Sequence, residues 1–258
     1  MLKRRFSLIL MLVLLATVYR LYQIQTQSIW FDEGWSAYAA AQPTLDAAWR
    51  ADPTNPPLYY VLLNIAAHLF GTTEFALRFV SLLLGLPLIP LVFQLARRSA
   101  RSERAGRYAV LLTAISAPLW WASQEARMYT LLALLIVICA LAWQMLITRP
   151  RRAAWIALWL GELALLYAHN TGPIAAIWLN AVTLLIWIVR RRPDLRIWIG
   201  GQIVVGLLWL PYFLQRFVLL QAANSAVTSA PQIGVPLLAE IWAGLWVAPW
   251  ALAIKGLP

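Results

Sequence analysis

Seven long apolar runs separated by polar connections constrain the fold of this chain more than any other feature. A transmembrane helix needs about 20 mostly apolar residues to cross a hydrocarbon layer of about 30 Å, and these runs approach that length. We therefore predict an all-α integral membrane protein with about seven transmembrane helices. The expected spans cover roughly residues 6–24, 75–96, 108–123, 129–147, 153–168, 172–189 and 197–214.

The composition agrees with this prediction and excludes several other classes of protein. Of the 258 residues, 62% are apolar and only 12% are charged, whereas soluble proteins carry about 25% charged residues. A mean hydropathy of +0.70 is typical of repeated membrane crossings. The single cysteine, Cys139, lies in an apolar run, which excludes a disulfide framework and a cysteine-type zinc site.

The net charge of +11 is explained by where the basic residues lie. They gather in every second connection, whereas the intervening connections carry most of the acids. Cytoplasmic connections of membrane proteins are enriched in Lys and Arg. The alternation therefore predicts a cytoplasmic N-terminus and argues against nucleic-acid binding. The basic clusters lie within residues 3–5, 97–107, 149–152 and 190–196.

One apolar segment, Leu58 to Phe70, is too short to be counted among the spans. As a helix of 13 residues it would reach only about 20 Å. We predict that it lies at the outer interface, with Tyr60, Asn64 and His68 forming one polar stripe. The first external loop then covers about residues 25–73 and carries short interfacial helices.

An adjacent acid pair, Asp32 and Glu33, follows the first span inside an aromatic stretch. Two carboxylates beside apolar rings repel each other and lose solvation, which favours proton uptake by one of them and provides a general base for a hydroxyl or an amine. The alternative is that Asp32 caps a short helix running through Ala39 while Glu33 faces water. The residues alone leave both interpretations open.

Other ionisable side chains also deserve a functional interpretation. Residues 123–129 contain Glu125 and Arg127, which would bind an anionic head group or form an interfacial ion pair. His169, in the next external connection, is a candidate phosphate donor or metal ligand, or a simple polar cap. Glu162 lies within a span, where a carboxylate is either functional or a protonated partner of a neighbouring helix.

Taken in order, five segments resemble polytopic glycosyltransferases of the GT-C fold, specifically the group that includes protein O-mannosyltransferases and the lipid A aminoarabinose transferase. The resemblance covers about residues 1–215. The chain departs from bacterial relatives at Asn55, where they commonly carry His, at Met128 in place of Pro, and at Asn170 in place of an aromatic residue. The segments are residues 30–33 (Trp-Phe-Asp-Glu), 55–60 (Asn-Pro-Pro-Leu-Tyr-Tyr), 74–81 with Arg78, 123–127 (Ser-Gln-Glu-Ala-Arg) and 167–169 (Tyr-Ala-His).

The resemblance implies transfer of a sugar from a polyprenyl-phosphate carrier to a lipid, glycan or protein acceptor, with inversion at the anomeric carbon. It implies a multi-pass protein of the plasma (inner) membrane with its active site on the outer face. The carrier brings an activated sugar, so no nucleotide-binding loop is needed. No GxGxxG or Walker pattern occurs in the sequence.

The same resemblance assigns roles to individual residues. Asp32 is expected to take the acceptor proton, with Glu33 as its neighbour or second contact. Arg127 is expected to stabilise the departing phosphate, and His169 or Arg78 would add a second donor.

Further residues are expected to support this site. Glu125 would orient Arg127 or, together with Asp32, hold a divalent cation, and no other cofactor is expected. The expected substrate-lining residues are Asn55, Tyr59, Tyr60, Asn64 and His68.

Two other functions compete with this one: a polytopic transporter or flippase that uses Glu162 as part of its path, and a non-catalytic membrane fragment. Transporters place polar groups near the midplane, often in two related halves, whereas here the polar groups gather at one face. We expect residues 1–215 to form the transmembrane module. We expect residues 216–258 to be an external or interfacial segment that begins a further C-terminal region.

Overall fold

Helices make up most of the computed structural model, which describes residues 2–191 and 193–226, and no strand occurs in these residues. This confirms the predicted all-α membrane fold. The helices are α1 (Leu2–Leu21), α2 (Phe31–Ala40), α3 (Leu45–Trp49), α4 (Leu58–Phe70), α5 (Glu74–Gly85), α6 (Leu88–Ser99), α7 (Glu103–Ala114), α8 (Ala117–Ser123), α9 (Tyr129–Thr148), α10 (Arg152–Ala168), α11 (Gly172–Arg190) and α12 (Leu195–Ala226).

Four segments are long and apolar enough to cross a membrane: Glu74–Ser99, Tyr129–Thr148, Gly172–Arg190 and Leu195–Arg216. Ile9–Leu21 and Leu58–Phe70 are shorter apolar helices. Length and composition thus establish four candidate spans within the described residues, while the count of seven stays a prediction.

Two of the expected spans are each built from two helices. The run at 75–96 divides into α5 and α6, because Pro87 lacks the N–H that a continuous helix would use. The run at 108–123 divides into α7 and α8, where the Ser116 hydroxyl accepts the Leu119 N–H and caps α8. Hydropathy alone did not reveal either break.

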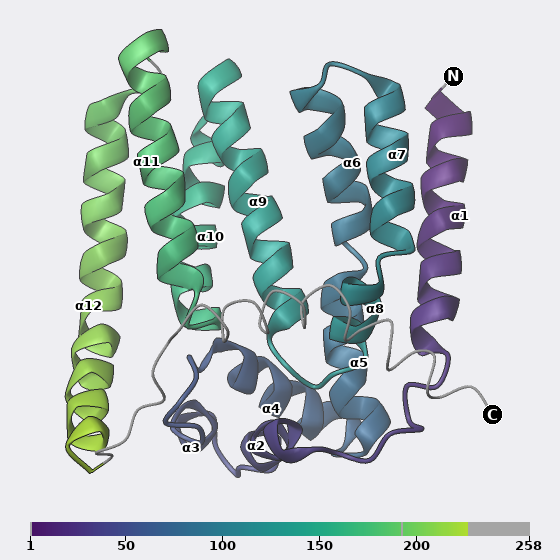
Figure 1. The fold of residues 1–258 in the computed structure, drawn as a ribbon, viewed down its shortest axis with the longest axis vertical. Coiled ribbons are helices and arrows are strands. Elements are labelled where there is room, and N and C mark those ends of the chain that lie inside the picture. Colours follow the sequence, from purple (N-terminus) through teal and green to yellow (C-terminus); the bar gives the residue numbers. More distant parts are fainter. Residues whose placement is uncertain (1, 192, 227–258) are drawn as a thin grey trace, which may run out of the picture. The chain divides into compact units, whose positions relative to one another are not determined.

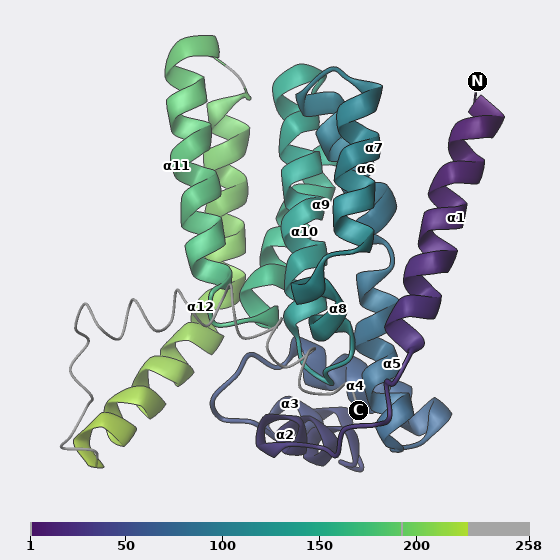
Figure 2. The same ribbon diagram turned by 45° about the vertical axis from the view of Figure 1, so that its right-hand side comes forward.

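The first external loop contains α2, α3 and α4, as expected. Figure 1 and Figure 2 both show these helices lying across the lower ends of α5, α9 and α10. The bounds of α4 agree with the prediction: Pro57 is its N-cap, and Gly71, at φ +86°, ends it. We call α2, α3, α4 and their connections, residues 25–73, the lower layer.

A buried apolar cluster joins the lower layer to the upright helices. Tyr59, Tyr60 and Leu63 of α4 pack with Leu131 of α9 and Leu165 of α10. Burial of apolar surface at about 25 cal/mol per Å² makes this contact a main source of stability for the layer. The layer is therefore anchored to the upright helices.

The basic connections lie at the opposite end of these helices. In Figure 1 the α6–α7 connection and the upper ends of α9 and α11 point away from the lower layer. The distribution of Arg97–Arg107, Arg149–Arg152 and Arg190–Arg191 is therefore one-sided, as the alternation of charges predicted.

The chain divides into two compact units, Met1–Trp209 and Leu210–Pro258. In the first, Gln202 of α12 donates to Glu162 of α10 at 2.6 Å, and Asn180 of α11 donates to Gln202 at 3.0 Å. The described part of the second unit is the continuation of α12 through Ala226, and Pro211 lies inside this helix. The expected external segment at 216–258 otherwise lies outside the described residues.

Candidate functional site

The site is organised by the first turn of α2. Trp30 is the N-cap residue of this helix but provides no side-chain cap, and Asp32 and Glu33 occupy the first turn. Negative charge is favourable there because the helix dipole is positive at its N-terminus. The alternative in which Asp32 caps the helix and Glu33 faces water is wrong, since Glu33 is 0% exposed.

Arg78 of α5 binds the Glu33 carboxylate. The Arg78 Nε and Nη2 atoms donate to Oε1 and Oε2 of Glu33 at 2.9 and 2.7 Å. Oε1 also accepts the backbone N–H of Ala126 at 2.7 Å. The remaining Arg78 donors reach the carbonyl oxygens of Ile24 and Gln27 at 2.9 and 2.8 Å.

The pairing gives Glu33 and Arg78 a structural role instead of the contact with substrate that the sequence predicted. Both side chains are buried and their polar atoms are used within the protein, so neither faces substrate in this conformation. The pair instead joins α2 and α5 to the 124–128 loop. Glu33 follows Asp32 in the sequence, and Ala126 precedes Arg127. This connection therefore sets the distance between Asp32 and Arg127.

Arg127 lies at the centre of the site. Its Nη1 atom donates to the carbonyl oxygen of Asp32 at 2.9 Å and to the Tyr60 hydroxyl at 3.1 Å. Its backbone carbonyl accepts the Ser81 hydroxyl at 3.0 Å. The interaction with Tyr60 helps to raise the pKa of Arg127 despite burial, so the guanidinium stays charged.

The Asp32 carboxylate is half-buried and has no hydrogen bond or ion pair to the described part of the chain. It interacts electrostatically with Arg127. A carboxylate that is partly desolvated, near a fixed cation and free of other partners is able to accept a proton from a bound hydroxyl.

His169 comes close to the same cation from the connection between α10 and α11. Its Nδ1 accepts the Thr171 N–H at 3.1 Å, which leaves the ring proton on Nε2. Burial and the charge of Arg127 lower the pKa of His169. The ring is therefore neutral at pH 7 and provides one N–H donor.

Glu125 points to a different partner than expected. The Trp30 indole N–H donates to its Oε2 atom, and no ion pair joins Glu125 to Arg127 within residues 2–191 and 193–226. Burial, with a further contribution from Glu33, raises the pKa of Glu125 to about 7. In the described chain no group of three His, Cys, Asp or Glu side chains is placed to hold a metal ion. A divalent cation held by Glu125 together with Asp32 stays a prediction.

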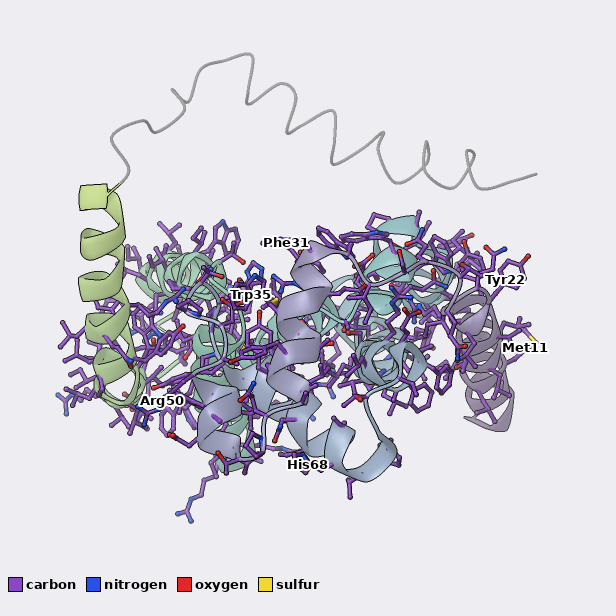
Figure 3. All side chains as sticks on the ribbon, turned by 90° about the horizontal axis from the view of Figure 1, so that it is seen from below. Met11, Tyr22, Phe31, Trp35, Arg50 and His68 are labelled. Carbon is purple, nitrogen blue, oxygen red and sulfur yellow. The ribbon has the colours of Figure 1, made fainter. Side chains whose placement is uncertain are left out.

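The expected polar stripe of α4 divides into three different environments. Tyr60 reaches Arg127, but Asn64 is buried and donates to the carbonyl oxygens of Ala39, Ala40 and Gln42 at 3.3, 3.0 and 2.8 Å. His68 is exposed, and Figure 3 shows it at the edge of the lower layer opposite Phe31. The stripe as a whole therefore does not line the site.

Tyr59 and Asn55, the other expected substrate-lining residues, bond to neighbouring protein groups. The Tyr59 hydroxyl lies 2.6 Å from Ser81 Oγ, which supports the Arg127 backbone. Asn55 donates to Asp52 at 2.9 Å. Sequence reasoning assigned no role to Asp52, although an acid two residues before Thr54 is a recognisable turn signal.

Apolar cavities lie beside α2 and among α9, α10 and α11. One, of about 820 Å³, lies beside Asp32 and is lined by Ile29, Trp30, Phe31, Gly34, Trp35, Tyr38, Ala51 and Pro53. Figure 3 shows Phe31 and Trp35 along α2. The other, of about 330 Å³, lies among α9, α10 and α11 and is lined by Ile136, Cys139, Ala140, Trp143, Leu165, Ala175, Trp178, Leu179 and Val182.

Residues 54–167 match the family model described as dolichyl-phosphate-mannose-protein mannosyltransferase. The match includes Arg78, Glu125 and Arg127, and it confirms the resemblance predicted from the sequence. It supports a glycosyltransferase of the mannosyltransferase type. No curated protein and no solved structure gives a significant match.

Proposed function

We propose that this chain transfers a sugar from a polyprenyl-phosphate donor to an acceptor at the outer membrane face, with inversion and with Asp32 as the base. The likeness to a mannosyltransferase family over residues 54–167 is the premise. The observation that carries the proposal is the contact between Arg127 and the Asp32 carbonyl oxygen at 2.9 Å. It fixes the guanidinium against the backbone of Asp32, whose carboxylate interacts with the same cation electrostatically.

The chemistry needs both groups at once. The acceptor oxygen attacks the anomeric carbon while the bond from that carbon to the phosphate oxygen breaks. The acceptor proton passes to Asp32, and the phosphate leaves with the bonding electrons. Arg127 and the Nε2–H of His169 stabilise the developing negative charge, more strongly beside a membrane than they would in water.

The two apolar cavities indicate where the donor and the acceptor would bind. The cavity among α9, α10 and α11 includes Leu165 and Ala175, each within one helical turn of the connection that carries His169. We propose that it receives the prenyl chain of the donor. The cavity beside α2 would then receive the acceptor near Asp32.

Glu33 and Arg78 act in this proposal as positioning residues. Their ion pair keeps α2 and the 124–128 loop together, and neither side chain contacts substrate. No step of this proposal passes through a cation.

Transfer of radiolabelled sugar from a panel of polyprenyl-phosphate donors, in membranes that contain the chain, tests the proposal. Asp32→Asn should lower transfer at least about hundredfold, because general base catalysis contributes that much, without lowering the melting temperature. Arg127→Gln should also abolish transfer. The control is Asp46→Asn, an exposed acid of the same layer whose ion pair within the described residues is with Arg50.

Two results would count against the assignment. Normal transfer by Asp32→Asn would remove Asp32 as the base. Loss of folding in that variant would make Asp32 a structural residue. The anomeric configuration of the product, read by NMR coupling constants, tests inversion separately.

A further inference from the structure

Asp52 is a buried carboxylate that receives an unusual number of hydrogen bonds. It lies in the turn between α3 and α4 and is 5% exposed. Oδ1 accepts the N–H and the hydroxyl of Thr54 at 2.6 and 2.5 Å. Oδ2 accepts Asn55 Nδ2 at 2.9 Å and the Tyr60 hydroxyl at 2.5 Å.

These bonds determine the charge of Asp52. Burial opposes ionisation, but the donors from Thr54, Tyr60 and Asn55 outweigh it and lower the pKa of Asp52. An ionised carboxylate only accepts hydrogen bonds. The Tyr60 hydroxyl must therefore donate to Asp52.

The direction of that bond fixes the next one. Tyr60 has a single hydroxyl proton, so once this proton faces Asp52 only the oxygen lone pairs face Arg127. Arg127 Nη1 donates to this oxygen at 3.1 Å. Burial and Asp52 raise the pKa of Tyr60, which keeps its proton in place.

We infer that Asp52 is a positioning residue for Arg127 and acts through the hydroxyl of Tyr60. Two acceptors hold Nη1 of Arg127, the Tyr60 oxygen and the Asp32 carbonyl oxygen, while the buried Nε has no partner in the described residues. Loss of the Tyr60 contact would remove one of these two acceptors and leave the Asp32 carbonyl oxygen and the hydrogen bond with Tyr129 to aim the guanidinium. The consequence for donor binding rests on the proposed function.

Two substitutions interrupt the hydrogen-bonded chain from Asp52 through Tyr60 to Arg127, which we call the relay, at different points. Asp52→Asn presents an amide N–H or a weaker acceptor to Tyr60, so the hydroxyl proton is free to turn toward Arg127 and weaken that contact. Tyr60→Phe removes the hydroxyl and leaves the buried ring in place. Both should misplace Arg127, and the double variant should be no worse than the more damaging single one.

Binding of farnesyl phosphate, a short polyprenyl phosphate, to the detergent-solubilised chain measures the consequence. We expect each single variant to weaken binding about tenfold, as the loss of one charge-assisted hydrogen bond would do. A double variant that is also about tenfold weaker supports the relay. One that is about a hundredfold weaker shows independent effects and overturns it. Asp46→Asn is the matched control.

Chemical labelling separates this inference from the proposed function. Phenylglyoxal modifies arginine, and mass spectrometry reads its rate at Arg127 without any donor. We expect labelling several-fold faster in Asp52→Asn and in Tyr60→Phe than in the parent chain. An unchanged rate overturns the inference whatever the protein binds. Faster labelling in a chain that binds no farnesyl phosphate supports the positioning role and counts against the proposed donor.

Folding is checked by circular dichroism and thermal unfolding of each variant. If Asp52→Asn fails to fold, Tyr60→Phe decides the question alone. Its labelling rate then has to rise for the inference to stand.

Discussion

Glu33 and Arg78 form a two-point ion pair between the first turn of α2 and the body of α5, 45 residues apart in the sequence. Their side chains are 0% and 3% exposed. The Glu33 carboxylate also holds the Ala126 N–H, so one buried group joins two segments of the candidate site. Asp32 and Arg127 are the immediate neighbours of the residues that it joins.

Breaking this pair should strongly destabilise the protein. Glu33→Gln leaves a buried guanidinium without its counter-ion, at a cost of about 3–5 kcal/mol. Arg78→Lys should also destabilise, because an ammonium does not reproduce the two-point geometry. Thermal unfolding in detergent measures both effects.

The exposed pair of Arg50 and Asp46 is the matched comparison, with side chains 70% and 71% exposed. Arg50→Ala should change stability by no more than about 1 kcal/mol. Equal losses in the two pairs would contradict the structural role given to Glu33 and Arg78.

Glu125 should make stability depend on pH in a predictable direction. Its pKa is raised to about 7 from 4.5 by burial. The folded chain therefore binds this proton more tightly than the unfolded chain, and the stabilisation is complete below about pH 4.5 and lost as pH rises through about 7.

The difference in melting temperature between the parent chain and Glu125→Gln isolates this effect, because other groups titrate in both. Glutamine keeps an acceptor for the Trp30 indole N–H. Between pH 5 and 8 the parent chain should lose stability relative to the variant. Parallel curves would show that Glu125 is ionised throughout.

The sequence predicted those features that depend on local signals. The proline pair before Leu58 and the glycine after Phe70 set the bounds of α4, because proline favours a helix start and Gly71 adopts a left-handed φ. The alternation of basic connections likewise predicted which helix ends lie together. Both signals can be read within a few residues.

Contacts between segments far apart in the sequence could not be predicted from such local signals. The sequence placed Asp32 and Glu33 as neighbours with similar chemistry, yet Glu33 points into the protein toward Arg78 and Asp32 does not. A helix separates adjacent side chains by about 100°, so the start of α2 decides which acid is buried. That start depends on packing against α4 and α5, which no local pattern records.

Substitutions of Asn64 and His68 should change the stability of the protein by different amounts, although the two residues were expected to act together. Asn64→Leu removes the donor to three carbonyl oxygens at and just after the end of α2, two of them in buried hydrogen bonds, and should cost about 1–3 kcal/mol. His68→Ala removes an exposed side chain and should change stability by less than about 0.5 kcal/mol. Thermal unfolding separates them, and similar losses would restore the idea of one continuous stripe.

Two neighbouring glycines of α12 should respond to alanine with opposite signs. A Cβ atom at Gly201 would lie 2.0 Å from Nε1 of Trp159 in α10, whereas one at Gly200 would meet nothing within 4 Å. The Trp159 ring has little freedom to move, because it packs against Trp155 at 5.5 Å between centroids.

Gly201→Ala should therefore cost about 1–3 kcal/mol through overpacking. Gly200→Ala should stabilise by about 0.5–1 kcal/mol, since alanine loses less entropy in a helix. Melting temperatures of both variants in the same detergent decide the matter. A stabilised Gly201→Ala would mean that α12 does not approach α10 this closely, and the hydrogen bond from Gln202 to Glu162 would then need to be tested by replacing Gln202.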